Sequence, residues 1–253
     1  MTSNTRVAVV TGGAAGIGAA IVEQLVTDGF IVAVADVNEP AARELASRLS
    51  ESGSRAFPIH IDVSDAASIE YAFESVAQTY GRCDVLVNNA GIAGTFPLID
   101  YPLEHWKRVL DLNVSGPLLC SQAAARMMRN AGWGRIVSIA SVSGVRASVG
   151  RAAYGTSKAA LIGLTRQMAV ELAALGITAN CVAPGPIETP LTREGHSPAT
   201  REAYHRAVPL RRYGQPSEIA AAVSFLCSEG ASYVSGQVLA VDGGFLAAGL
   251  LEI

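Results

Sequence analysis

Short apolar runs alternate with longer, helix-patterned segments along the whole chain, and this alternation is the strongest constraint on the fold. The apolar runs are residues 7–10, 31–35, 56–61, 84–87, 135–140, 177–183 and 237–241. Strands that are buried on both faces of a sheet consist of such continuous, β-branched runs. We therefore predict a single-domain α/β fold, a doubly wound, Rossmann-like parallel sheet of about seven strands flanked by helices.

The segments between these runs predict the helices and one loop region. Helical spacing is found at residues 19–28, 39–52, 65–80, 103–130, 152–175 and 217–228, with an interruption of the fourth helix near Gly116-Pro117. Residues 187–216 are polar and irregular and contain four prolines, which is typical of a mobile substrate lid.

Composition excludes several classes of function. The 253 residues show no compositional break, so we treat 1–253 as one dinucleotide-binding and catalytic domain. A net charge of −3 gives no reason to expect nucleic acid or an anionic membrane as a partner. No apolar run is long enough to span a bilayer, and the N-terminus leads directly into a strand rather than a signal peptide.

Cysteine and histidine spacing predicts no metal site. The four cysteines are far apart and form no C-x-x-C pair, so we expect buried free thiols and a cytoplasmic location: Cys83, Cys120, Cys181 and Cys227. The four histidines are not spaced as metal ligands, and we expect them to be solvated or hydrogen-bonded, with His196 placed in the lid: His60, His105, His196 and His205.

A glycine-rich turn follows the first predicted strand and opens the first helix. It reads T-G-G-A-A-G-I-G over residues 11–18, with Gly12, Gly16 and Gly18 at intervals that differ from the usual G-x-G-x-x-G. Such a turn lets backbone amides approach a diphosphate at a helix N-terminus. Taken alone, the turn is weak evidence, because a tight turn without a ligand would explain it too.

Asp36 at the end of the second strand strengthens the dinucleotide interpretation. A carboxylate roughly 20 residues after the glycine loop can bind a ribose diol and repels a 2′-phosphate. Neither Ala14, Ala15 nor Val37 supplies a compensating cation. We therefore predict that NAD(H) is preferred over NADP(H); the alternative is that Asp36 is merely a solvated residue at a strand end.

Tyr154 and Lys158 are the candidate proton-transfer pair. Four residues apart on a predicted helix, their side chains leave the same face. A phenol has an ordinary pKa of about 10, and a fixed ammonium nearby lowers it toward neutral pH. Ser141 follows the strand at 135–140 and offers a hydroxyl to the same volume, with Ser143 as an alternative. Together they suit proton exchange with a carbonyl or alcohol oxygen.

Taken together, the motifs make the chain resemble the short-chain dehydrogenase/reductases from end to end. The matching motifs are T-G-x-x-x-G-I-G at 11–18, Asp62-Val63, N-N-A-G at 88–91, Asn113, Ser141, Y-x-x-x-K at 154–158, Pro184-Gly185 and Thr189. The chain departs from the family pattern at Arg211, where a glycine is frequent near the lid, and at Ser138 and Ala140 beside Ser141.

The resemblance implies four catalytic residues. Tyr154 would be the general acid/base, and Ser141 would orient the substrate oxygen. Lys158 would hold the nicotinamide ribose and depress the pKa of Tyr154. Asn113 would fix a water that continues the proton path from Lys158 to solvent.

The resemblance also implies a cofactor cleft. The diphosphate would lie on Gly12, Gly16, Ile17 and Gly18, and Asp36 would bind the adenosine ribose. Asp62 and Val63 would meet the adenine. The remaining residues of the cleft would be Asn89, Gly91, Tyr154, Lys158, Ile187 and Thr189, of which Ile187 and Thr189 would fix the carboxamide.

The function that the resemblance implies is that of an NAD-dependent short-chain alcohol dehydrogenase or ketoreductase acting on a small molecule. The rival is a 3-oxoacyl-(acyl-carrier-protein) reductase using NADPH, which Asp36 disfavours, as does Leu175 at a position where those enzymes tend to have a basic residue. A non-catalytic dinucleotide sensor is disfavoured because Tyr154 and Lys158 are both present.

Three further points concern the substrate and the assembly. Arg146 and Arg151 lie between Ser141 and Tyr154, and they are either substrate anchors or ordinary exposed loop residues. Many family members are homotetramers that associate through the long helices and the C-terminal strand, so the same assembly is expected. The apolar tail at 245–253 suggests burial against another subunit.

Overall fold

The computed structural model describes residues 5–50 and 55–249, and these form one seven-stranded sheet in which all neighbouring strands are parallel. The strand order is β3-β2-β1-β4-β5-β6-β7. Their bounds are β1 Val7–Thr11, β2 Ile31–Asp36, β3 Ala56–His60, β4 Val85–Asn88, β5 Gly134–Ile139, β6 Ile177–Pro184 and β7 Val238–Val241. The predicted fold class is confirmed, and each predicted strand is present within about a residue of its expected bounds.

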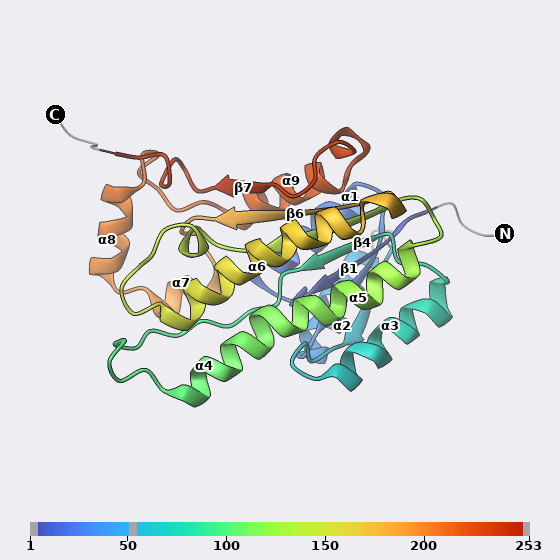
Figure 1. Ribbon diagram of the computed structural model, residues 1–253, viewed down its shortest axis with the longest axis horizontal. Coiled ribbons are helices and arrows are strands. Elements are labelled where there is room, and N and C mark those ends of the chain that lie inside the picture. The colour runs from blue at the N-terminus through green and yellow to red at the C-terminus, as the bar shows by residue number, and fades with distance from the viewer. Residues whose placement is uncertain (1–4, 51–54, 250–253) are drawn as a thin grey trace.

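Two apolar cores lie on the two faces of this sheet. Successive residues of a strand point to opposite faces, and accordingly Ala8 and Val10 of β1 belong to one core while Val7 and Val9 belong to the other. Helices α1 (Gly16–Thr27), α2 (Glu39–Ser50) and α9 (Pro216–Cys227) cover the first face. Helices α3 (Ala66–Tyr80), α5 (Gly116–Met128) and α6 (Ala152–Glu171) cover the second (Figure 1). Helices therefore cover both faces of the sheet, and its strands end beyond this cover.

The helix expected to break at Gly116-Pro117 continues through that point. Helix α4 (Leu103–Leu110) passes into a π-helical turn, Asp111–Ser115, which runs directly into α5. A side chain at Gly116 would collide with the carbonyl of Val63, so the glycine serves close packing rather than a break. Pro117 lies in the first turn of α5, where a proline is tolerated.

Other helix boundaries differ modestly from expectation. Helix α1 begins at Gly16, inside the glycine-rich turn, rather than at residue 19. Helix α6 ends at Glu171 and is followed by a 3-10 turn, Ala173–Leu175. The predicted C-terminal end of the second helix, at residues 51–52, falls outside the described residues.

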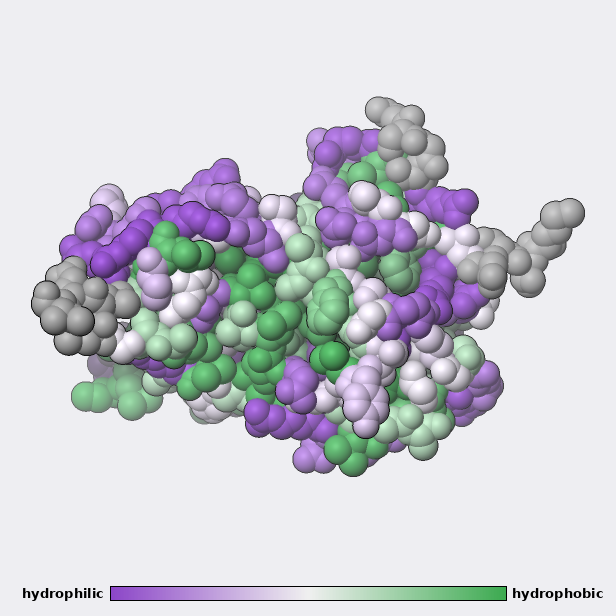
Figure 2. Space-filling model, turned by 90° about the horizontal axis from the view of Figure 1, so that it is seen from above, coloured by the Kyte–Doolittle hydropathy of each residue, from purple (hydrophilic) through white to green (hydrophobic). Residues whose placement is uncertain are grey.

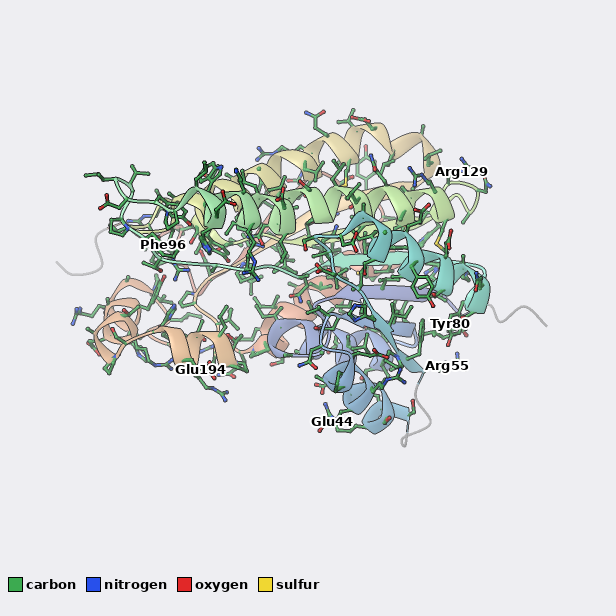
Figure 3. All side chains as sticks on the ribbon, turned by 90° about the horizontal axis from the view of Figure 1, so that it is seen from below. Glu44, Arg55, Tyr80, Phe96, Arg129 and Glu194 are labelled. Atoms are coloured by element: carbon green, nitrogen blue, oxygen red, sulfur yellow. The ribbon has the colours of Figure 1, made fainter. Side chains whose placement is uncertain are left out.

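The predicted lid is more ordered than its composition suggested. It contains helix α7 (Pro190–Gly195), capped by Thr189, and helix α8 (Pro198–Ala207), capped by Ser197. Two of the prolines that suggested irregular structure occupy the first turns of these helices, where their missing N–H costs nothing. Both helices lie beyond the carboxyl ends of the strands, and Figure 3 shows Glu194 of α7 at the same end of the molecule as Phe96, which follows β4.

The described part of the C-terminal tail packs against its own chain. Phe245 lies 6.2 Å from Tyr204 of α8, measured between ring centroids, and its side chain is half-buried. The tail was expected to be buried against another subunit; its Phe245 contacts Tyr204 of the segment 187–216, and residues 250–253 lie outside the described part. Within the described residues, none of the helices combines the length and apolarity required to span a bilayer.

Candidate functional site

Ser141, Tyr154 and Lys158 meet where β5 ends and α6 begins. Ser141 starts a 3-10 turn, Val142–Gly144, and its Oγ accepts a hydrogen bond from the Ser143 amide at 3.1 Å. One helical turn separates Tyr154 from Lys158, and the Lys158 Nζ lies 5.7 Å from the centre of the Tyr154 ring. The same Nζ donates a 2.8 Å hydrogen bond to the Ile139 carbonyl. Ser143 contributes its amide to this arrangement.

The pKa values in this cluster correct one expectation. Burial lowers the pKa of Lys158 to about 8, since its side chain is almost completely enclosed. The pKa of Tyr154 is raised rather than depressed: burial has the largest effect, and a hydrogen bond with Ser141 and the charge of Arg151 only partly oppose it. Desolvation therefore raises the pKa of the Tyr154 phenol more than the Ser141 hydrogen bond and the Arg151 charge lower it.

Asn113 joins the π-helical turn to the catalytic helix. Its Oδ1 accepts from the Ile92 amide at 2.9 Å, and its Nδ2 donates to the Ile92 carbonyl and to the Ser157 Oγ. Ser157 in turn donates to the Tyr154 carbonyl at 2.8 Å. A π-helical turn inside a helix is frequent at functional sites, and this one places a fully buried amide beside α6.

Gly91 keeps the space next to this amide open. A Cβ built on Gly91 would lie 3.3 Å from the Asn113 Oδ1 and 3.4 Å from the Lys158 Nζ. The glycine therefore lets the backbone after β4 pass directly beside the Lys158 ammonium.

The glycine-rich turn is fixed by its own backbone and by Asn89. Gly12 and Gly16 adopt left-handed φ values of 61° and 55°. A side chain at Gly18 would collide with the Gly12 carbonyl, so helix α1 can start this close to the strand only with glycine there. The Asn89 Nδ2 donates to the Thr11 and Gly12 carbonyls at 3.0 and 2.9 Å, which holds the turn against β4.

The start of helix α1 has the chemistry of a diphosphate site. The N-cap residue is Ala15, whose side chain cannot cap the helix, and the first turn carries no acidic residue. The first amides of a helix have no partner within the helix and carry positive partial charge. At this helix start, with Ile17 and Gly18 in the first turn, the residues present therefore fit a dinucleotide phosphate.

The acidic residues expected at the adenosine end lie at the ends of β2 and β3. Asp36 accepts hydrogen bonds from the Ala14 amide at 3.0 Å and the Asn38 amide at 2.9 Å. Asp62 accepts from the Ser64 amide and hydroxyl, which lower its pKa. Val63 is buried beside Asp62.

The lid begins directly opposite the glycine-rich turn. Ile187 is buried, and Thr189 caps α7 by accepting from the Thr192 amide at 3.2 Å. A Cβ on Gly16 would lie 3.7 Å from the Thr189 side chain, so the two segments are neighbours. The site residues predicted from the sequence thus lie at or just beyond the carboxyl ends of the strands, with Asp36 at the end of β2 and Tyr154 beside the end of β5.

The lid also carries an aromatic cluster that the sequence reasoning largely missed. The His196 Nδ1 and the Tyr213 hydroxyl are 2.9 Å apart, and the His196 ring stacks on Tyr204 at 5.5 Å. Tyr204 also contacts the Phe245 ring at 6.2 Å, so the cluster links the segment 187–216 to the described part of the C-terminal tail. The only available signal was the concentration of Tyr and His in an otherwise polar segment.

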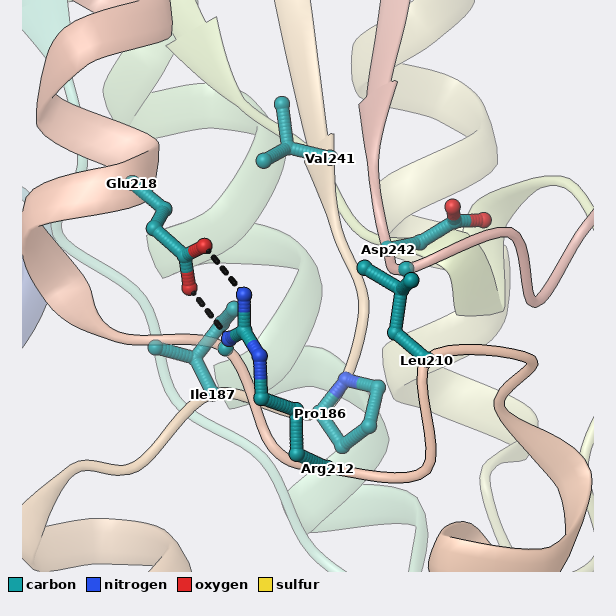
Figure 4. A pocket seen from close by; sticks show the side chains of 9 residues that line it. Pro186, Ile187, Leu210, Arg212, Glu218, Val241 and Asp242 are labelled. Atoms are coloured by element: carbon teal, nitrogen blue, oxygen red, sulfur yellow. Dashed lines mark hydrogen bonds and ion pairs between the residues drawn. The ribbon is translucent and has the colours of Figure 1, made fainter.

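Several other features complete the description of the site and its surroundings. A small cavity of about 40 Å³ is bordered by Pro186, Asp242 and the Arg212–Glu218 ion pair (Figure 4), and Ile187 is the one predicted site residue that lines it. The four cysteines are free and buried, as predicted. His105 differs from expectation, because its Nε2 is buried without a hydrogen-bond partner. Among residues 5–50 and 55–249, no cluster of three or more potential ligands could hold a metal ion.

Comparison with known proteins places this site in a family. The model of a family described as enoyl-(acyl carrier protein) reductase matches residues 12–246. A 3-oxoacyl-(acyl-carrier-protein) reductase FabG of Aquifex aeolicus is 40% identical over 94% of this chain and 96% of its own length. A cis-4-hydroxycyclohexanecarboxylate dehydrogenase of Sinomonas cyclohexanicum is 41% identical over 96% of this chain and 97% of its own.

Solved structures of dehydrogenases have the same fold as this chain. A gluconate 5-dehydrogenase from Burkholderia cenocepacia, in complex with NADP and tartrate, has a TM-score of 0.93 at 35% identity, covering 96% of both chains. A 7α-hydroxysteroid dehydrogenase complexed with NADH and 7-oxoglycochenodeoxycholic acid has a TM-score of 0.92 at 36% identity, covering 94% of this chain and 93% of the other. Together with the cluster of Ser141, Tyr154 and Lys158 and the glycine-rich turn, these matches over more than nine tenths of the chain show that it belongs to the short-chain dehydrogenase/reductase family of oxidoreductases.

Proposed function

We propose that the protein is an NAD(H)-dependent dehydrogenase that interconverts a secondary alcohol and a ketone, with Tyr154 as the general acid/base. The observation that carries this proposal is the convergence of Ser141, Tyr154 and Lys158 at the strand edge onto which the glycine-rich turn also opens. A proton carrier within reach of a dinucleotide site is the minimum that such a reaction needs.

The chain's own residues would divide the work as follows. Tyr154 gives its hydroxyl proton to the ketone oxygen in reduction and takes it from the alcohol in oxidation. Ser141 donates a hydrogen bond to the same oxygen and stabilises the charge that develops on it. Asn113 and Lys158 lie on the path by which the proton would reach solvent. The dinucleotide would be held by the α1 amides at its diphosphate, by Asp36 at its adenosine ribose and by Ile187 and Thr189 at its carboxamide, and its nicotinamide would supply the hydride in reduction and accept it in oxidation.

Preference for NAD(H) follows from the charge around Asp36. Its carboxylate is partly exposed, and the described residues provide no ion pair to it. A 2′-phosphate would therefore meet an uncompensated negative charge. We expect NADH to be used with at least tenfold higher kcat/KM than NADPH, and Asp36→Ala to narrow that ratio. An unchanged ratio would place the discrimination elsewhere.

The role of Tyr154 is tested by removing one oxygen atom. Tyr154→Phe is expected to lower turnover by at least 1000-fold while NADH still binds, as judged by quenching of protein fluorescence. The matched control is Tyr233→Phe, because Tyr233 is fully exposed and precedes the amino end of β7, whereas Tyr154 lies at the carboxyl ends of the strands. Undiminished turnover in Tyr154→Phe would refute the assignment.

The 40% identity to FabG favours one alternative, a 3-oxoacyl-(acyl-carrier-protein) reductase using NADPH. The two candidates separate in a single assay with 3-oxoacyl thioesters, simple ketones and both cofactors. NADPH-dependent reduction of the thioester with no turnover of simple ketones would support the alternative.

We further propose a cytoplasmic homotetramer with a lid at residues 187–216. Strand β7 is an unpaired sheet edge that carries no charge, and its middle residues are exposed; Figure 2 views the molecule from this side and shows apolar residues gathered there. A groove of about 350 Å³ between α5 and α6 offers a second contact surface. Light scattering that gives a monomer mass at micromolar concentration would contradict the assembly.

A further inference from the structure

Arg151 brings a positive charge to the catalytic phenol. It is the residue immediately before α6, and its guanidinium carbon lies 5.6 Å from the centre of the Tyr154 ring. Within the described residues no carboxylate forms an ion pair with Arg151, whose side chain is only half-buried. A guanidinium held beside a reactive group and left without an anion is a ready binding partner for a carboxylate.

The lid closes the other side of this position. His196 stacks on Tyr204, and Tyr204 packs against Phe245. A second arginine, Arg146, lies 5.3 Å from the Phe245 ring, is exposed, and also has no ion-pair partner in the part of the chain described. Burial lowers the pKa of His196 and the charge of Arg151 lowers it further, and the same charge partly opposes the burial that raises the pKa of Tyr154, so both rings lie within range of the Arg151 charge.

The acids of this region are already engaged. The Glu188 carboxylate forms ion pairs with Arg201 at 2.5 Å and with Arg193 at 3.2 Å. The Asp242 carboxylate accepts from the Gly244 and Leu246 amides. Neither group is bonded to Arg151 or Arg146, so among the described residues these two arginines have no ion-pair partner beside the rings of Tyr154 and Phe245.

We propose that the substrate carries a carboxylate, and that Arg151 binds it while Tyr154 exchanges a proton with the hydroxyl or oxo group. This inference rests on the proposed function and narrows its substrate to hydroxy acid and oxo acid pairs. The rings of His196 and Tyr204 cover the carbon skeleton between the two polar ends. Arg146, at the exposed rim, attracts the anion before it binds.

The test compares oxo acids with their methyl esters, which differ in charge and little in shape. A panel of 2-, 3- and 4-oxo acids with their esters is reduced by the holoenzyme with NADH, and the ratio of kcat/KM for acid over ester is recorded for each pair. Loss of Arg151 also changes the pKa of Tyr154, but that effect is common to acid and ester and cancels in the ratio.

We expect the wild-type enzyme to prefer at least one acid over its ester by about 100-fold, a preference typical of one charge-assisted contact. Arg151→Met should reduce the ratio to within a few-fold of one, and Arg151→Lys, which keeps the charge but loses the planar fork, should retain part of it. Arg43→Met, which removes an exposed arginine on α2, should leave the ratio unchanged.

The possible outcomes separate the two proposals. Equal use of acids and esters by the wild-type enzyme, or a preference that survives Arg151→Met, overturns the carboxylate assignment and leaves the dehydrogenase function standing. Absence of turnover with every ketone and both cofactors overturns the proposed function and this inference with it.

Discussion

Replacing Lys158 by methionine should separate the catalytic value of this residue from its cost to the fold. The ammonium is 4% exposed and has one hydrogen bond, to the Ile139 carbonyl. Its pKa falls from 10.5 to about 8, which corresponds to roughly 3 kcal/mol against the charged form in the folded protein. Methionine has a similar length and no charge, and its introduction forfeits about 1 kcal/mol of hydrogen bonding. We expect Lys158→Met to be inactive and about 2 kcal/mol more stable at pH 7.

The dependence on pH gives the sharper signature. Below pH 8 the lysine is charged in both the folded and the unfolded chain, so the whole burial cost is present. Between pH 8 and 10.5 the folded protein binds fewer protons than the unfolded chain, and the wild-type protein gains stability relative to the variant. By pH 10 the gain should be roughly 2.5 kcal/mol, which would cancel the advantage of Lys158→Met.

The measurement is urea unfolding followed by tryptophan fluorescence, without cofactor, at pH 7 and pH 10 and at equal protein concentrations. Lys107→Met is the control, because Lys107 is 57% exposed and paired only with Glu104, so its stability difference should not change with pH. If Lys158→Met is less stable than the wild type at pH 7, and by the same amount at pH 10, the ammonium is not desolvated as the structure indicates.

Three other variants test separate contacts. Arg211 has a φ of 55° and is the sole non-glycine residue with positive φ in the described part of the chain. Arg211→Gly should relieve this backbone strain and raise the free energy of urea unfolding by about 0.5–1 kcal/mol. A lower free energy of unfolding would show that the side-chain contacts of Arg211 contribute more than the strain costs. The hydrogen bonds from Arg212 lower the pKa of Glu218 to about 2, so the stability that this half-exposed ion pair provides is present above pH 4.5 and declines as the pH falls toward 2. The difference in melting temperature between the wild type and Glu218→Gln should therefore narrow between pH 4.5 and pH 2, and a constant difference would contradict this assignment. A Cβ on Gly144 would lie 2.7 Å from the Lys158 carbonyl carbon, so Gly144→Ala should lower kcat by at least tenfold with little change in the Kd of NADH; retained kcat would show that the turn can shift harmlessly.

Much of the fold could be predicted because the decisive signal is local. Strands β1, β2 and β4 are buried on both faces, and a strand in that position must be a continuous apolar run, such as Val7 to Val10. The lid could not be predicted in the same way. Its helices are short and polar, and their existence depends on caps by Thr189 and Ser197 rather than on an apolar face.

The electrostatics of the site were the least predictable part. Spacing alone placed Lys158 beside Tyr154 and suggested a depressed phenol pKa. The actual direction depends on how completely the surrounding elements exclude water from the phenol, which is a property of the folded chain and not of the motif. The same holds for Arg151, because only the folded structure reveals that no carboxylate of the described residues forms an ion pair with it.

The catalytic geometry itself depends on contacts that the motif residues do not include. Ser141 and Lys158 are far enough apart in sequence that only packing can set their distance. The 3-10 turn after Ser141 lies directly on α6 because Gly144 allows its backbone to touch that of Lys158. A larger residue at 144 would push the turn away from the helix and carry the serine hydroxyl with it. The motif thus supplies the reacting groups, whereas a glycine outside it determines whether they meet.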